Sequence, residues 1–105
     1  MTQTKIDADE AIQNGIGLIG DKWSLLILAS LRSGEPVRWG AITEYTGCYP
    51  ATLSNRLKFL EEIGLIERLP HRTLPPSVDY QLTDLGTRAL PVVDALGAFA
   101  TEVEG

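Results

Sequence analysis

The sequence predicts a mainly α-helical fold with one small β-hairpin, which places the protein in the α+β class. Two patterns carry this prediction: apolar residues recur at helical spacing over most of the 105 residues, and they alternate with polar residues only between residues 65 and 82. The length is that of one domain, because two separate cores of about 50 residues each would be only marginally stable. Residues 1–105 are therefore predicted to form a single domain.

Composition excludes several classes of protein. With 44% hydrophobic and 22% charged residues, the chain has the make-up of a soluble globular domain. One Cys and one His exclude an intrachain disulfide and a Cys- or His-rich metal site, so we expect no metal and no cofactor. The chain shows no signal peptide and no apolar run of the roughly 18–20 residues that span a bilayer, which predicts a cytoplasmic protein without a membrane partner. It also lacks the residue patterns of catalytic sites, so we do not expect an enzyme.

The first two helices are predicted from a capping pattern and from hydrophobicity. Asp7 followed by Glu10 resembles a capping box, and the apolar residues after it recur at helical spacing, which predicts a helix over residues 8–19. Residues 23–31 are apolar on almost every side, as is typical of a buried helix. The Gly and Pro of residues 33–36 end this second helix.

A short helix, a turn and a longer helix are predicted next. The spacing of Trp39, Ile42 and Tyr45 predicts a helix over residues 38–45, followed by a turn over 46–50. Pro50 suits the first position of a helix that runs to residue 63. On this longer helix Leu57 and Leu60 fall within about 40° of Leu53. The opposite face carries Ala51, Asn55, Lys58 and Glu62.

A hairpin and a last helix complete the chain. Residues 65–69 and 78–82 are predicted to be its two strands, joined by a proline-rich tip. Thr83 is predicted to cap a helix over residues 84–103, with a kink at Pro91.

This order of elements is that of a winged helix-turn-helix, with the helix-turn-helix over residues 37–63 and the wing over residues 65–82. In such domains the second helix reads base edges in the DNA major groove, so residues 50–63 are the predicted recognition helix. Asn pairs with adenine, Ser and Thr bond to several base edges, and Ala permits close approach. The predicted base-reading residues are Ala51, Thr52, Ser54 and Asn55, and the predicted contacts to phosphate are Arg56 and Lys58. Arg38, at the start of the helix predicted over residues 38–45, is a further predicted DNA-binding residue.

The net charge of −5 at first argues against a nucleic-acid partner. Its distribution removes the objection, because residues 32–80 carry six basic and six acidic residues and the whole excess lies toward the two ends. A winged helix that contacts only other proteins, without specific DNA binding, stays open as the alternative function.

Four stretches of the chain resemble the HxlR-type winged-helix transcriptional regulators of the MarR-like superfamily. They are LIGDKWSLLIL at residues 18–28, ATLSNRLKFLEEIGLIER at 51–68, PPSVDYQLTDLG at 75–86 and ALPVVDAL at 89–96. The resemblance implies a homodimeric DNA-binding regulator. It places Lys22 near a phosphate, His71 and Arg72 in the wing against the minor groove or backbone (residues 69–78), and Tyr49 beside the backbone in place of the usual Ser or Thr cap.

The resemblance also implies that the first and last helices, residues 7–19 and 84–103, form the dimer interface. Gly15 and Gly17 would let two first helices approach closely. The predicted interface residues are Ile12, Ile16, Leu90, Val93, Leu96 and Phe99. A last helix that folds back on its own domain stays open as the alternative.

Double-stranded DNA, with a near-palindromic operator, and a second copy of the chain are the predicted partners. A small-molecule effector is a further candidate partner, in a groove between the terminal helices and the winged core lined by Trp23, Tyr45 and Phe99.

One cysteine is a candidate redox sensor. Family members that sense oxidants carry a Cys near the start of the first helix, where this chain has Glu10, so that mechanism is not implied. Cys48 lies instead in the turn before the recognition helix, whose positive dipole end can lower a thiol pKa. The alternative is a buried thiol without a function of its own.

Overall fold

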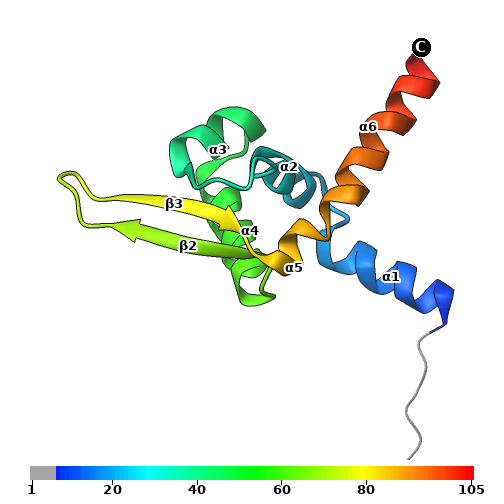
Figure 1. Cartoon of the computed structure of the whole chain (residues 1–105), viewed down its shortest axis with the longest axis horizontal. Helices are drawn as coiled ribbons and strands as arrows, with labels where there is room; N and C mark the ends of the chain where they lie inside the picture. The colour runs from blue at the N-terminus through cyan, green and yellow to red at the C-terminus, as the bar shows by residue number, and fades with distance from the viewer. Residues whose placement is uncertain (1–6) are drawn as a thin grey trace, which may run out of the picture.

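The computed structural model of the chain describes residues 7–105, so residues 1–6 of the predicted domain lie outside it. The described part contains six helices and a three-stranded sheet (Figure 1). The helices are α1 (Ala8–Ile19), α2 (Lys22–Ser30), α3 (Trp39–Thr46), α4 (Pro50–Glu62), α5 (Asp84–Thr87) and α6 (Leu90–Glu104). The strands are β1 (Val37–Arg38), β2 (Ile66–His71) and β3 (Ser77–Leu82). The predicted α+β class is confirmed.

The sheet is antiparallel with strand order β1-β3-β2. Strands β2 and β3 form the predicted hairpin, which projects from the helical part of the molecule (Figure 1). Strand β1 was not predicted: Arg38 was assigned to the following helix, but it pairs with Asp79 in β3. A two-residue strand shows no period of its own, and its partner is distant in sequence, so this pairing leaves no local signal.

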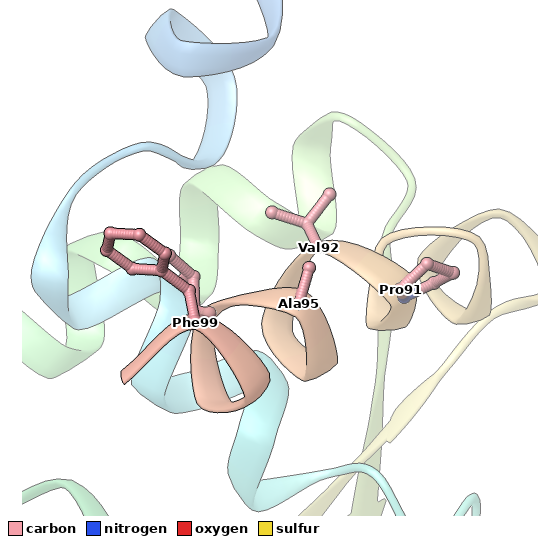
Figure 2. Close-up of a pocket in the computed structure, with 5 residues that line it drawn as sticks. Pro91, Val92, Ala95 and Phe99 are labelled. Atoms are coloured by element: carbon pink, nitrogen blue, oxygen red, sulfur yellow. The ribbon is translucent and has the colours of Figure 1, made fainter. Parts of the chain in front are cut away.

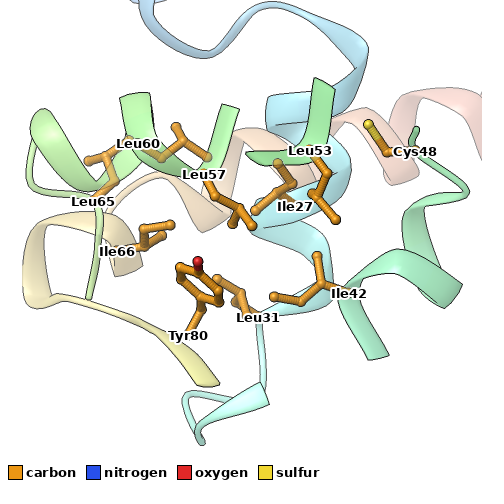
Figure 3. Packing of buried hydrophobic residues seen from close by; sticks show 10 residues of the cluster. All are labelled: Ile27, Leu31, Ile42, Cys48, Leu53, Leu57, Leu60, Leu65, Ile66 and Tyr80. Atoms are coloured by element: carbon orange, nitrogen blue, oxygen red, sulfur yellow. The ribbon is translucent and has the colours of Figure 1, made fainter. Parts of the chain in front are cut away.

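The core lies where α2, α3 and α4 meet the base of the hairpin (Figure 3). The prediction that the second helix is buried is confirmed, because Ile27 and Leu28 of α2 are fully inaccessible. The buried cluster consists of Ile27, Leu31, Ile42, Cys48, Leu53, Leu57, Leu60, Leu65, Ile66 and Tyr80. These residues come from both sides of the turn before α4, so the core holds the helix-turn-helix and the wing as one unit.

The predicted last helix is two helices. Helix α5 ends at Thr87 and α6 begins at Leu90, with Pro91 in the first turn of α6. The linking residues Arg88 and Ala89 keep right-handed helical φ and ψ, but their N–H groups donate to carbonyls three residues back and not four. Proline lacks an N–H and collides with the carbonyl four residues earlier, which here is that of Thr87. The tighter turn that divides the predicted helix therefore lies just before Pro91.

Gly86 fixes the position of α5 against the wing. A Cβ at Gly86 would stand 1.9 Å from the carbonyl oxygen of Leu65, so only glycine allows this approach. Thr83 caps α5 as predicted, accepting from the Gly86 N–H at 3.0 Å, and its hydroxyl donates to the Gly64 carbonyl at 2.6 Å.

The terminal helices α1 and α6 diverge from the winged core on the side opposite the hairpin (Figure 1). Neither contains a buried residue. Helix α1 has the predicted bounds and cap, with Asp7 accepting from the Glu10 N–H at 2.7 Å. Helix α6 contacts α2, and its Asp94 forms an exposed ion pair at 2.6 Å with Arg32, which follows α2.

Candidate nucleic-acid interface

The turn between α3 and α4 sets the direction of the second helix. Gly47 adopts a positive φ of 66° that ends α3, and its N–H donates to the Thr43 carbonyl. The Thr46 hydroxyl donates to the Ile42 carbonyl at 2.8 Å and accepts from the Cys48 N–H at 3.2 Å. Pro50 then occupies the first turn of α4, as predicted. These contacts build the predicted helix-turn-helix.

Helix α4 has one buried and one exposed face. Leu53, Leu57 and Leu60 lie in the core, as predicted. Ala51, Ser54, Asn55 and Lys58 are exposed, and Thr52 is half-buried. The residues predicted to read bases are thus brought together on one accessible side, but their contact with DNA stays a prediction.

Arg56 makes several contacts within the chain. Its guanidinium donates to the hydroxyl of the fully buried Ser24 at 3.1 Å from Nε and at 2.8 Å from Nη2, and it pairs with Asp21 at 3.2 Å. It also lies over the Phe59 ring, 4.7 Å from the centroid. Arg56 therefore joins α4 to the start of α2, and its predicted contact with phosphate stays a prediction.

Asp21 is the acidic partner in this contact and also the N-cap of α2. One carboxylate oxygen accepts from the Ser24 N–H at 3.0 Å, and the other faces Arg56. Burial alone would raise the pKa of Asp21, but the hydrogen bonds from Ser24 and the charge of Arg56 outweigh it and lower this pKa. Asp21 was not among the predicted site residues, because its partner Arg56 lies on a helix distant along the chain.

Asp21→Ala is expected to destabilise the fold by about 1–2 kcal/mol, most of it from the lost cap, because solvent screening limits the half-exposed ion pair. Asp21→Asn keeps a capping oxygen and should cost about 0.5 kcal/mol. A lowered pKa stabilises the fold above the ordinary value of 3.8, and this contribution is lost as the pH falls through the folded value. Urea unfolding should therefore show the gap between wild type and Asp21→Asn closing in acid. A gap that is constant with pH would contradict the ion pair.

The predicted basic contacts outside α4 lie in three places. Lys22 is exposed at the start of α2, with its Nζ 4.8 Å from the centroid of the Trp23 ring. Arg38 precedes α3, and His71 and Arg72 lie where β2 meets the tip of the wing, all three exposed. His71 also has a partner within the chain, because its Nε2 lies 3.0 Å from the carboxylate of Asp79. Tyr49 is 73% exposed and makes no side-chain cap to α4.

Cys48 is buried, and the predicted lowering of its pKa is wrong. Burial raises the pKa of the Cys48 thiol, a hydrogen bond with the Tyr49 backbone lowers it in part, and the charge of Asp21 raises it again. The reactive thiolate is therefore scarcer than for an exposed cysteine. This environment matches the alternative of a buried thiol without a sensing function.

The structure does not bring together the three aromatic residues predicted to line an effector groove. Phe99 lines a hollow on α6 with Pro91, Val92 and Ala95 (Figure 2), whereas Tyr45 is exposed on α3 and Trp23 packs beside the core. No helix among the described residues is long and apolar enough to cross a bilayer.

The sequence matches known helix-turn-helix proteins. The HxlR-like helix-turn-helix family matches residues 18–104. A relative from Halalkalibacterium halodurans, named as an HTH-type transcriptional regulator, is 37% identical over 82 residues, which are 77% of this chain and 73% of the relative. A relative of the same description from Synechocystis is 36% identical over 85 residues, which are 81% of this chain and 63% of the relative. The matched stretch thus spans from about half to about three quarters of the curated relatives' lengths.

The fold is similar to solved structures of transcriptional regulators. A MarR-family regulator from Porphyromonas gingivalis W83 matches with a TM-score of 0.83 and 30% identity, over 95% of this chain and 98% of that one. The reduced form of the regulator YodB from B. subtilis matches with a TM-score of 0.70 and 30% identity, over 91% and 92%. These relatives are regulators, a class that is not enzymatic. With a family match over most of its length, the chain belongs to the HxlR-like helix-turn-helix family of transcriptional regulators.

Proposed function

We propose that this protein is a dimeric, sequence-specific DNA-binding regulator, with α4 in the major groove and the wing on the backbone or in the minor groove. The observation that carries the proposal is the division of α4 into two faces. Its leucines anchor the helix in the core, and its outward side offers Ser54 and Asn55 beside the small Ala51. A rigid helix with short polar side chains and room for close approach suits direct contact with base edges.

The distribution of charge supports the same orientation. The exposed cations Arg38, Lys58 and Arg72 belong to the helix-turn-helix and the wing, where phosphates would pass. The acidic Asp9, Glu102 and Glu104 lie on the terminal helices, which diverge on the opposite side of the molecule (Figure 1). DNA can therefore approach the winged face, where basic and acidic residues balance, without meeting the excess negative charge of the two ends.

Exposed apolar side chains support a dimer through α1 and α6. Ile12, Ile16, Leu96 and Phe99 of the predicted interface are exposed, with Ile16 at 62% and Phe99 at 63%. Leu90 and Val93 are half-buried within the chain, and Val92, which was not predicted, is exposed in their place. So much apolar surface on two helices without a buried residue marks an interaction site.

We assign the groove between α1, α2 and α6 to the second copy of the chain and not to an effector. The groove holds about 470 Å³ and is lined by Ile12, Gly15, Ile16, Ile19, Gly20, Leu25, Val92 and Leu96. A Cβ at Gly15 or Gly17 would meet nothing within 4 Å in the same chain, so a partner helix has room to approach there. A twofold dimer built in this way sets two recognition helices on successive turns of DNA.

Selection of bound sequences from a random double-stranded DNA library tests the proposal. We expect enrichment of a near-palindrome with half-sites about 10 base pairs apart, or a multiple of this. Affinity for the selected site should fall steeply with salt, because each phosphate contact releases counterions. A library that is not enriched, with no genomic fragment retained in a low-salt gel shift, would instead favour the alternative of a winged helix that contacts only proteins.

A further inference from the structure

We propose that Asp79 is a positioning residue for DNA binding, whose carboxylate holds Arg38 and His71 as one basic edge between the helix-turn-helix and the wing. The inference rests on the proposed function. Asp79 lies in β3, the central strand, opposite Arg38 of β1 and Leu69 of β2. One of its carboxylate oxygens lies 3.0 Å from Nε2 of His71, and the other lies 3.8 Å from Nε of Arg38. A single carboxylate thus contacts a guanidinium from one neighbouring strand and an imidazole from the other.

The three side chains differ in exposure in a way that suits this role. The side chain of Asp79 is only 15% exposed, whereas those of Arg38 and His71 are 72% and 43% exposed. The acid lies beneath the two basic groups, which face the solvent. A phosphate approaching this edge would meet Arg38 and His71 before it met the carboxylate.

The oxygen that faces Arg38 is buried and has no hydrogen-bond partner among the described residues. A distance of 3.8 Å is too long for a hydrogen bond, so charge attraction holds Arg38 without fixing it. Leaving a buried carboxylate oxygen unpaired is unfavourable by itself. The arrangement is explained if the two Nη groups of Arg38 must stay free to donate to a phosphate while its Nε stays near the Asp79 carboxylate.

The direction in which affinity for DNA changes when Asp79 is replaced separates this proposal from a purely electrostatic effect. If Asp79 acted only as a nearby negative charge, its removal would strengthen phosphate binding. If Asp79 positions Arg38 and His71, its removal frees two side chains that must then be ordered on binding, and affinity falls. The two readings predict opposite changes for the same substitution.

The experiment compares Asp79→Asn with Glu67→Gln on the operator selected from the random library. Glu67 is exposed on β2 in the same sheet, so Glu67→Gln removes one charge from the wing as a matched control. We expect Asp79→Asn to weaken binding about five- to twentyfold and to lower the slope of affinity against salt by about one. Glu67→Gln should bind as tightly as wild type or more tightly. In an Arg38→Ala, His71→Ala background, Asp79→Asn should no longer weaken binding.

Several outcomes would overturn the inference. The positioning role is refuted if Asp79→Asn binds as tightly as the wild type. It is also refuted if Asp79→Asn lowers affinity by the same factor whether Arg38 and His71 are present or replaced. If Asp79→Asn fails to fold by circular dichroism, Asp79→Thr, which suits a strand, is measured against the same expectations. If the wild type binds no DNA, the proposed function itself is refuted. If the wild type binds and Asp79→Asn binds with the same affinity, only the role of Asp79 is refuted.

Discussion

Glu in place of Ile16 or Leu96 is expected to convert the dimer into a monomer and to weaken operator binding by about 100-fold or more, because two linked half-site contacts become one. Both side chains line the groove between α1, α2 and α6 and are largely exposed within one chain, at 62% and 47%. The substitution therefore costs the isolated subunit little. In the proposed dimer it would bury a carboxylate on each side of a twofold axis, which is strongly unfavourable.

Light scattering coupled to gel filtration measures the outcome. Wild type should elute at twice the chain mass of 11.4 kDa, and each Glu variant at the single mass. Leu74→Glu is the matched control, because Leu74 is an exposed apolar residue at the tip of the wing, far from the groove in sequence and in structure. A wild type that is already monomeric, or Glu variants that remain dimeric, would refute the interface.

Asn55→Ala is expected to weaken binding to the selected operator by about 1–3 kcal/mol, which is roughly five- to 150-fold, and to relax the sequence preference at one position of each half-site. Asn55 is exposed on the outward face of α4, so its loss should leave the core unchanged. Binding to unrelated DNA should change little, because that binding depends on phosphate contacts.

Asn14→Ala controls for the chemistry of this substitution. Asn14 is an exposed helical Asn on α1, two residues after Ile12, and so on the side of that helix away from Ile12 and Ile16. Titration of both variants on specific and nonspecific DNA, with thermal unfolding as a check on the fold, decides the matter. Equal affinity of Asn55→Ala and wild type for the operator would mean that α4 does not read bases through Asn55.

Local patterns predicted most elements and the two faces of α4. The period of apolar residues and the caps at Asp7 and Thr83 act within one turn, so they can be recognised along the chain. The same reasoning did not find β1, because a two-residue strand exists only through its pairing with β3. It also predicted one continuous helix with a kink at Pro91, where the chain forms two helices joined by a tighter turn at Arg88 and Ala89.

The sequence by itself determined the class of fold, the helix-turn-helix with the two faces of α4, and the family resemblance, because each follows from neighbours along the chain. The tertiary structure decided the roles of individual polar groups. It joined Arg56 to Ser24 and Asp21, buried Cys48 with a raised pKa, and set Asp79 between Arg38 and His71. A charged or polar side chain takes its role from the groups within a few ångströms of it, and here those groups come from other elements of the fold.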